Sequence, residues 1–364
     1  MSETVLHVGG ASPYDVVVGS DLRDHLPRML GPQVERVAVV CPGSLEGVVE
    51  DLTEPLSDLD VTVLEVPEGE EAKQAGVAEA CWEALGEEGF TRSDAVVTVG
   101  GGATTDLGGF VAATWLRGVR VVHVPTSLLA MVDAAVGGKT GINTSAGKNL
   151  VGSFHEPAGV LCDLALLETL PAEELRSGLG EVVKCGFIAD PEVLRIVEST
   201  PHEGLTPSSD ELRELVERAV RVKIDVVVGD LKETGGTDGH PGREVLNYGH
   251  TLAHAIERVD GYRIRHGEAV AIGCVYVAEL ARRVGLLADD VADRHRSAFA
   301  RAGLPTTYSD ATFEELLAVM RVDKKARGSR LRFVVLEDLA RPVVLTGPAE
   351  DDLRAAYAAI GGAA

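Results

Sequence analysis

The chain has 364 residues and a formal net charge of −23 at pH 7. This length favours two domains over a single core, and the excess of carboxylates argues against nucleic acid or an anionic membrane as a partner. Five cysteines are scattered without close spacing, which is typical of a reducing compartment. No apolar run reaches the length of a membrane span and no signal peptide precedes Val5, so we expect a cytoplasmic protein.

The first half of the chain alternates strand and helix patterns. Apolar, β-branched runs predict strands at 14–18, 37–40, 61–66, 94–99 and 119–124. Helical spacing covers 72–85 and ends at glycines. Strands that alternate with helices indicate βαβ units and therefore a parallel sheet.

The second half changes character after Pro171. Helical patterns dominate there, at 172–185, 190–198, 209–227, 245–259, 268–284 and 289–302. Only the run 331–336 is β-like. We therefore place a domain boundary near residues 169–171, between an α/β domain (1–170) and a mainly helical domain (171–364).

The most informative cluster of residues is histidine-rich. His250 and His254 are four residues apart, which puts them on one face of a helix, and His266 follows sixteen residues after His250. Alone, the His250–His254 spacing is better explained by surface or core histidines. His266 and the carboxylate of Glu181 favour a metal site, because two histidines and one carboxylate leave a zinc-like ion an open position for substrate.

Gly100, Gly101 and Gly102 follow a predicted buried strand. Glycines at this point let backbone N–H groups approach a phosphate at a helix start. The spacing is not GxGxxG, because the next glycines are Gly108 and Gly109. The first clear strand after the N-terminal hairpin ends at Cys41, where a dinucleotide-binding fold would carry an acid. Either the adenosine ribose is held in another way, or the glycines do not mark a dinucleotide site.

Several charged residues stand in or near Gly-rich motifs. Lys139 and Lys148 are two of only eight lysines in the chain, and lysine is a compact point charge suited to phosphate or carboxylate. Asp133 precedes Lys139 by six residues and could orient a substrate hydroxyl, although an ordinary helix carboxylate would give the same pattern. Lys324 lies in a charged run that, taken alone, is typical of a solvated surface.

Together these motifs resemble the 3-dehydroquinate synthase family. The matching stretches occur in family order at 100–118, 125–143, 147–155, 170–188, 246–257, 266–273 and 323–325. The resemblance implies an α/β fold, with a Rossmann-like NAD-binding domain followed by a mainly α-helical metal-binding domain. It also implies a homodimer, NAD+ and one divalent metal, Zn2+ or Co2+.

The resemblance further implies roles for individual residues. The metal ligands are Glu181, His250 and His266, and His254 becomes a proton-handling neighbour rather than a ligand. The catalytic residues are His254, Lys139, Lys184 and Asp133. The substrate-binding residues are Arg117, Lys139, Lys148, Asn149, Lys184, Lys223, Arg243, Asn247 and Lys324. The NAD-binding residues are Glu68, Gly69, Glu70, Glu71, Ala72, Lys73, Gly100, Gly101, Gly102, Ala103, Thr104, Thr105, Asp106, Thr126, Ser127, Lys139, Lys148, Leu166, Leu167, Glu168 and Thr169.

Three stretches depart from the family pattern. Residues 230–233 are followed by extra residues through Gly242, Ala253 replaces a glycine, and residues 107–109 differ from the usual run. None of these changes removes a functional side chain.

The activity implied is the conversion of 3-deoxy-D-arabino-heptulosonate 7-phosphate to 3-dehydroquinate and phosphate in the shikimate pathway. NAD+ would be reduced and reoxidised within one turnover, around a phosphate elimination and an aldol closure. Alternatives are another sugar phosphate cyclase, such as an aminodehydroquinate, 2-deoxy-scyllo-inosose or valiolone-type synthase, or a metal-dependent polyol dehydrogenase of the same architecture.

Overall fold

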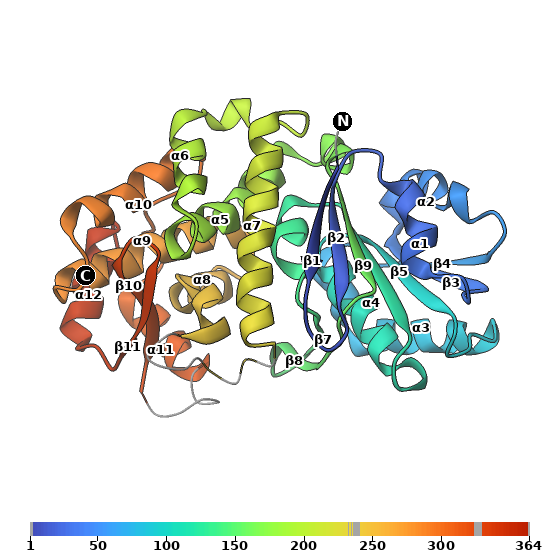
Figure 1. Cartoon of the computed structure of the whole chain (residues 1–364). Helices are drawn as coiled ribbons and strands as arrows, with labels where there is room; N and C mark the ends of the chain where they lie inside the picture. Colours follow the sequence, from blue (N-terminus) through green and yellow to red (C-terminus); the bar gives the residue numbers. More distant parts are fainter. Residues whose placement is uncertain (1–2, 232, 234, 236–240, 324–329, 363–364) are drawn as a thin grey trace. The chain divides into compact units, whose positions relative to one another are not determined.

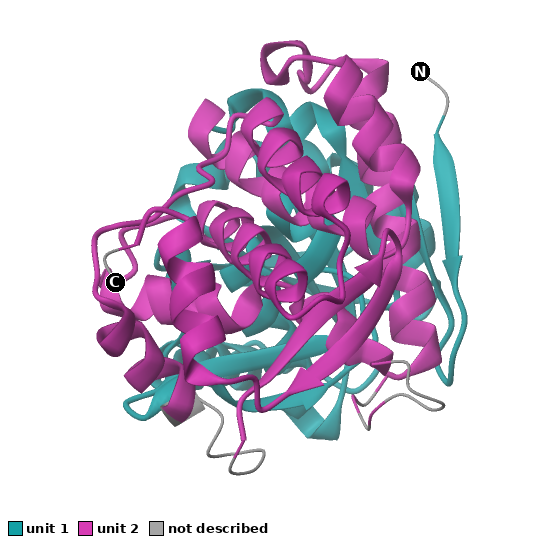
Figure 2. Cartoon of the chain, turned by 90° about the vertical axis from the view of Figure 1, so that its left-hand side faces the viewer, with its two compact units in different colours: residues 1–171 teal, residues 172–364 magenta. Residues whose placement is uncertain are grey.

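The structure is a computed structural model that describes residues 3–231, 233, 235, 241–323 and 330–362. The chain divides into two compact units, Met1–Pro171 and Ala172–Ala364 (Figures 1 and 2). Within the described residues, no helix is both long enough and apolar enough to cross a membrane.

The first unit is built on a seven-stranded sheet with the order β1-β2-β9-β6-β5-β3-β4. Only the edge pair β1–β2 is antiparallel, and the other neighbours run parallel. The predicted α/β class is therefore confirmed. The strands are β1 Thr4–Val8, β2 Tyr14–Gly19, β3 Arg36–Pro42, β4 Asp60–Val66, β5 Ala95–Gly100, β6 Arg120–Pro125 and β9 Gly159–Asp163.

Helices cover both faces of this sheet. Val39 of β3 belongs to a buried cluster with Leu26 of α1, whereas its neighbour Val40 packs in a second cluster with Leu107 of α4. Because successive side chains point to opposite faces, strands buried on both sides read as the continuous apolar runs seen in the sequence. The helices are α1 Leu26–Leu30, α2 Glu46–Thr53, α3 Ala75–Glu87 and α4 Gly102–Thr114, with short 3-10 turns η1 Arg23–His25, η2 Gly43–Leu45, η3 Glu54–Leu56, η4 Gly69–Lys73, η5 Trp115–Arg117 and η7 Leu164–Thr169.

One local prediction in this unit was wrong, and two other segments adopt structure that was not predicted. The helix predicted at 72–85 is interrupted, because Gln74 is extended (φ −102°, ψ 148°) between η4 and α3. Residues 139–154, for which no strand was predicted, form the antiparallel hairpin of β7 Lys139–Thr144 and β8 Gly147–Phe154. Asp133 lies in a π-helical turn, η6 Ala130–Ala134, as an ordinary helix carboxylate would.

The order of the parallel strands creates a switch point between β3 and β5. The chain leaves β3 toward β4 on one side and leaves β5 toward β6 on the other. In open α/β sheets, ligands bind outside the carboxyl ends of the strands at such a point. The carboxyl ends here are followed by Gly43 after β3 and by Gly101 after β5.

The second unit is mainly helical around the buried helix α9. Fourteen of the eighteen residues of α9 are buried, which makes it the centre of this unit. A hairpin of β10 Arg332–Asp338 and β11 Arg341–Thr346 is its only sheet within the described residues. The helices are α5 Ala172–Ile188, α6 Pro191–Ser199, α7 Asp210–Gly229, α8 His250–Val259, α9 His266–Arg283, α10 Asp289–Arg301, α11 Phe313–Asp323 and α12 Glu350–Ala359, with 3-10 turns η8 His202–Gly204 and η9 Gly242–Asn247.

The continuous helix predicted at 245–259 was also wrong. The chain makes the turn η9, and α8 begins only at His250. Gly249 between them has φ +80°, a left-handed conformation that favours glycine. A Cβ at Gly249 would lie 2.7 Å from the backbone nitrogen of Cys274, so the tight approach to α9 also requires glycine.

Candidate active site

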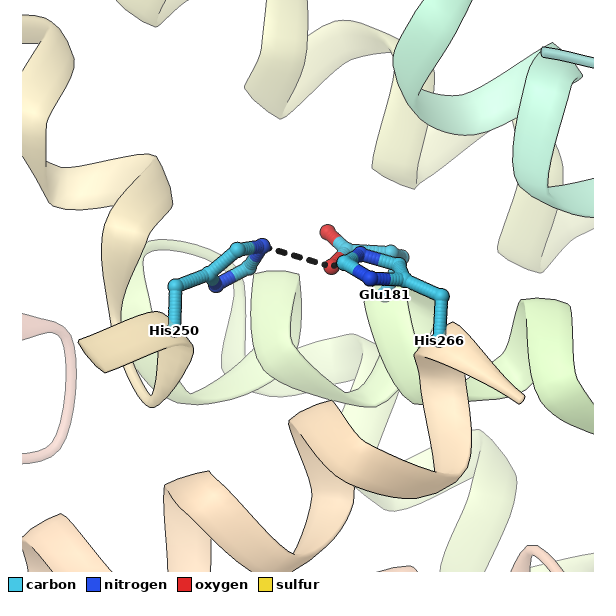
Figure 3. A group of neighbouring side chains, drawn as sticks. All are labelled: Glu181, His250 and His266. Atoms are coloured by element: carbon cyan, nitrogen blue, oxygen red, sulfur yellow. Dashed lines mark ion pairs between the residues drawn. The ribbon is translucent and has the colours of Figure 1, made fainter. Parts of the chain in front are cut away.

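Three side chains of the second unit converge from three helices. Glu181 lies in the middle of α5, while His250 and His266 are the first residues of α8 and α9. The Nε2 atoms of His250 and His266 lie 3.3 Å and 3.5 Å from Oε1 of Glu181 (Figure 3). One ligand atom from each residue falls within 4.8 Å of the others, a spacing suited to one shared metal ion.

Glycines beside these residues allow the convergence. A Cβ on Gly267 would overlap the carbonyl oxygen of Ser177, and one on Gly180 would overlap the carbonyl oxygen of Gly267. Helices α5 and α9 therefore cross backbone to backbone immediately next to Glu181 and His266. Both glycines are thus a packing requirement of the site.

The surroundings of Glu181 keep its carboxylate ionised, as a cation ligand requires. Burial opposes its ionisation, but the charge of Lys184 and the contacts with His250 and His266 outweigh burial and hold its pKa well below the usual range. Oε2 is ion-paired with Lys184. Oε1 is buried and accepts no hydrogen bond of acceptable geometry. An orphaned oxygen facing two imidazole nitrogens fits a divalent metal such as Zn2+.

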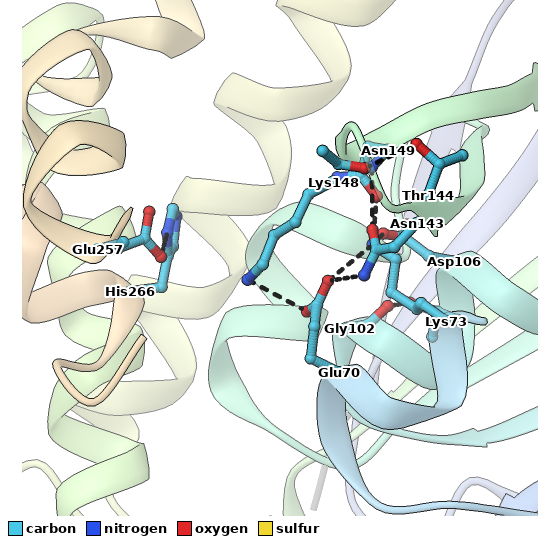
Figure 4. Close-up of polar contacts among 12 residues, drawn as sticks. Glu70, Lys73, Gly102, Asp106, Asn143, Thr144, Lys148, Asn149, Glu257 and His266 are labelled. Atoms are coloured by element: carbon cyan, nitrogen blue, oxygen red, sulfur yellow. Dashed lines mark hydrogen bonds and ion pairs between the residues drawn. The ribbon is translucent and has the colours of Figure 1, made fainter. Parts of the chain in front are cut away.

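The two imidazole rings are oriented by hydrogen bonds on their far side. Nδ1 of His250 donates to the carbonyl of Tyr248 at 3.1 Å. Nδ1 of His266 donates to Oε1 of Glu257 at 3.2 Å (Figure 4). Because Nδ1 is the donor in both rings, Nε2 is the nitrogen that can bind a metal. Burial opposes protonation of His266, but Glu181 and Glu257 outweigh burial and raise its pKa to about 10.

His254 lies close to this group without joining it. Its ring centroid is 5.3 Å from that of His250 and 6.3 Å from that of His266. Its side chain reaches solvent, yet the protein packed around the ring, together with His250, lowers its pKa. A neutral His254 beside the metal group is able to accept a proton.

The predicted anion-binding residues of this unit are largely buried. Nζ of Lys184 donates to the carbonyl of Leu246 at 2.7 Å, and Nη1 of Arg243 donates to the carbonyl of Leu231 at the same distance. Lys223 is buried on α7, and Nδ2 of Asn247 lies 3.5 Å from Oε1 of Glu233. Lys324 lies outside the described residues, and so do most of the extra residues that precede Gly242.

In the first unit, the predicted NAD-binding segments follow the carboxyl ends of parallel strands. Residues 68–73 follow β4, residues 100–106 begin at the end of β5, residues 126–127 follow β6 and residues 166–169 follow β9. The sheet therefore brings these distant segments to one edge. At that edge α4 begins at Gly102, so its free N–H groups face the position expected for a pyrophosphate.

A polar network joins these segments to the hairpin of β7 and β8 (Figure 4). Lys73 is buried and ion-paired with Asp106 at 2.6 Å, and it also donates to Asn149. Glu70 accepts from Asn143 at 2.7 Å and lies 3.6 Å from Nζ of Lys148. The cofactor-assigned and substrate-assigned residues of this unit are thus direct neighbours.

The remaining predicted residues of this unit lie nearby in sequence. Lys139 begins β7 and is exposed, and Asp133 is half-buried in η6. Asp133 acts electrostatically on Asp106: burial and Asp133 raise the pKa of Asp106, while Lys73 opposes them. Arg117 is exposed in η5 and has φ +69°.

Sequence reasoning missed Glu257, which orients His266. Its signal was its position seven residues after His250, on the same face of a helix. It also missed the ring of His295, which lies against the Tyr248 side chain and is far from it in sequence.

Comparison with known proteins assigns the chain to a family. The family model for the N-terminal part of 3-dehydroquinate synthase matches residues 63–177 of the sequence. The family model for the C-terminal part matches residues 178–326. The chain belongs to the 3-dehydroquinate synthase family. It is 54% identical over 368 residues to the 3-dehydroquinate synthase of Streptomyces avermitilis, covering 99% of this chain and 100% of that one. It is 56% identical over 359 residues to that of an Arthrobacter species, covering 97% of both.

Solved structures with this fold include other sugar phosphate cyclases. A 2-epi-5-epi-valiolone synthase from Streptomyces hygroscopicus, with NAD+ and Zn2+ bound, has a TM-score of 0.85 at 25% identity and covers 98% of this chain and 99% of that one. A 2-deoxy-scyllo-inosose synthase has the same TM-score at 23% identity, covering 97% of this chain and 99% of that one. An aldehyde reductase from E. coli, at TM-score 0.68 and 17% identity, shares the fold over 98% of this chain and 100% of that one.

Proposed function

We propose that this chain is a carbon–oxygen lyase that converts 3-deoxy-D-arabino-heptulosonate 7-phosphate to 3-dehydroquinate and phosphate. The observation that carries the proposal is the convergence of Glu181, His250 and His266 around an orphaned carboxylate oxygen. Identities of 52–56% to 3-dehydroquinate synthases, over nearly the full chain, support this substrate over those of the other cyclases.

Glu181, His250 and His266 would hold Zn2+ or Co2+, and residues at the carboxyl edge of the sheet would hold NAD+. The bound metal would lower the pKa of a substrate hydroxyl as a Lewis acid, and NAD+ would take up and return a hydride. The other tasks fall to the protein. Lys184 keeps Glu181 ionised, and the neutral ring of His254 accepts a proton from the substrate and passes it on.

The substrate carries two anionic groups, and cationic side chains are available for both. In the first unit we assign Arg117, Lys139, Lys148 and Asn149 to substrate binding. In the second unit we assign Lys184, Lys223, Arg243 and Asn247, with Arg243 and Lys223 contacting the carboxylate. We also propose that the protein works in the cytoplasm as a homodimer.

Substrate choice separates this proposal from its rivals. The wild-type protein, loaded with Zn2+ and NAD+, is incubated separately with the heptulosonate phosphate and with glucose 6-phosphate, and the products are identified by mass spectrometry. We expect 3-dehydroquinate from the first and no carbocycle from the second. Comparable turnover of glucose 6-phosphate would favour an inosose-type cyclase, and an uncyclised ketone with accumulating NADH would favour a polyol dehydrogenase.

Arg243 gives a second arm to this experiment. A single charge-assisted contact is worth about 1.5–3 kcal/mol, or roughly ten- to a hundredfold in affinity. Arg243→Ala should therefore raise KM for the heptulosonate phosphate by about this factor. Circular dichroism of the variant tests whether the fold is kept, since the side chain is buried.

A further inference from the structure

The carboxyl edge of β3 lacks the acidic residue expected of a dinucleotide site. Strand β3 ends at Cys41 and Pro42, and Gly43 follows at the switch point between β3 and β5. In dinucleotide-binding folds an Asp or Glu near this edge binds the ribose hydroxyls of the adenosine. If the chain binds NAD+, another group has to bind these hydroxyls.

The neighbouring strand supplies a carboxylate at this place. Glu65 of β4 is paired in register with Cys41 of β3. Its side chain folds back over β3, because a Cβ built on Gly43 would lie only 2.5 Å from Oε1 and 3.0 Å from Cδ of Glu65. The missing side chain at Gly43 thus makes room for the Glu65 carboxylate beside the switch point.

The surroundings of the Glu65 carboxylate leave it able to bind a ligand. Glu65 is exposed, and among the described residues its side chain forms no hydrogen bond or ion pair. It is electrostatically coupled to this edge: burial raises the pKa of the Cys41 thiol, and the charges of Glu65 and Glu46 raise it further. The carboxylates of Glu65 and Glu46 therefore give the carboxyl end of β3 a negative electrostatic potential.

We propose that Glu65 binds the ribose hydroxyls of the adenosine half of NAD+ and excludes the 2′-phosphate of NADP+. A carboxylate accepts two hydrogen bonds, which matches a pair of adjacent hydroxyls. A phosphate at the 2′ position would be repelled by Glu65 and by Glu46, which begins helix α2. This inference rests on the proposed use of NAD+, and it assigns the cofactor specificity to a residue of β4 rather than β3.

The test measures cofactor binding to the metal-loaded protein without substrate, by calorimetry. We expect Glu65→Ala and Glu65→Gln to raise the Kd for NAD+ by about tenfold or more, since a charge-assisted contact is lost. Glu50→Gln, at an exposed glutamate of α2, should leave the Kd unchanged. Wild type should bind NADP+ far more weakly than NAD+, and Glu65→Ala should narrow that difference.

An analogue of NAD+ lacking the 2′-hydroxyl of the adenosine ribose isolates the contact itself. Wild type should bind this analogue about tenfold more weakly than NAD+, whereas Glu65→Ala should bind both equally. An equal loss in wild type and variant, or an unchanged NAD+ affinity in both Glu65 variants, would refute the inference. Failure of the wild type to bind NAD+ at all would instead overturn the proposed function.

Discussion

The hydroxyl of Tyr248 donates a 2.8 Å hydrogen bond to Nε2 of His295, and both side chains are buried. The direction follows from the other ring nitrogen, because Nδ1 of His295 donates to the carbonyl of Val291 at 2.8 Å. Burial lowers the pKa of His295 to about 3, so the ring is neutral and Nε2 accepts. The carbonyl of the same Tyr248 accepts from His250, so this pair fixes the backbone that orients a proposed metal ligand.

Tyr248→Phe tests this support. Removal of the hydroxyl leaves Nε2 of His295 buried without its donor, which should lower the free energy of unfolding by about 1–3 kcal/mol. Urea denaturation followed by circular dichroism measures the change. An unchanged free energy of unfolding in Tyr248→Phe would show that the Tyr248 hydroxyl is not a structural contact.

Glu257→Gln addresses the orientation of His266. The amide keeps the size of the side chain but accepts a weaker hydrogen bond from Nδ1 of His266, so metal affinity should fall by about ten- to a hundredfold. Competition with a chromophoric zinc chelator measures the Kd. Glu244→Gln, which weakens a 2.9 Å ion pair to Arg332, serves as the control and should leave metal affinity unchanged. An unaltered Kd in Glu257→Gln would contradict the orienting role.

A second assay should distinguish the proposed metal ligands from His254. We expect Glu181→Gln, His250→Asn and His266→Asn each to lose stoichiometric Zn2+, whereas His254→Asn keeps it and loses turnover by about 10²–10⁴-fold, as for a proton-transfer group. Atomic absorption after gel filtration gives the metal content. Removing the metal from wild type with a chelator should also abolish turnover. A His254→Asn protein that purifies without metal would make His254 a ligand.

The family resemblance implies that Arg117 reaches the substrate phosphate in a neighbouring subunit, so a variant of Arg117 tests the homodimer proposal. Leu116 and Arg117 have φ angles of +47° and +69°, a backbone conformation that is costly for residues other than glycine and often kept for function. We expect Arg117→Ala and Arg117→Gly to raise KM by roughly ten- to a hundredfold with the fold intact. Arg120→Ala, at another exposed arginine, is the control. A fully active monomer in sedimentation analysis would contradict a role for Arg117 across a dimer interface.

The sequence predicted the sheet better than the details of the site. Runs such as 94–99 are continuous and apolar because the sheet is covered on both faces, so strand β5 was recognisable. The extended, exposed Gln74 interrupts a helical pattern that the surrounding residues continue. The left-handed Gly249 interrupts another, where the close approach to α9 depends on the tertiary fold. The hairpin of β7 and β8 was missed because its glycine-rich strands have no alternating apolar pattern.

The candidate site was likewise predictable from the sequence only in part. Glu181, His250 and His266 could be proposed together because the family motif joins them, and the structure brings them together. The role proposed for Glu65 could not be predicted from the sequence, because it depends on the pairing of β4 with β3 and on the absence of a side chain at Gly43. Such relationships between strands distant in sequence require the three-dimensional fold.

The most direct test of the proposed function counts phosphate against NADH. The protein is loaded with Zn2+, given NAD+ in an amount well below that of the heptulosonate phosphate, and followed by phosphate release and by absorbance of NADH. We predict that every substrate molecule releases one phosphate, many for each NAD+ present, with no net NADH at the end. Phosphate release that stops after one equivalent of NAD+, or NADH that accumulates in proportion to product, would contradict a reaction in which the cofactor is regenerated within each turnover.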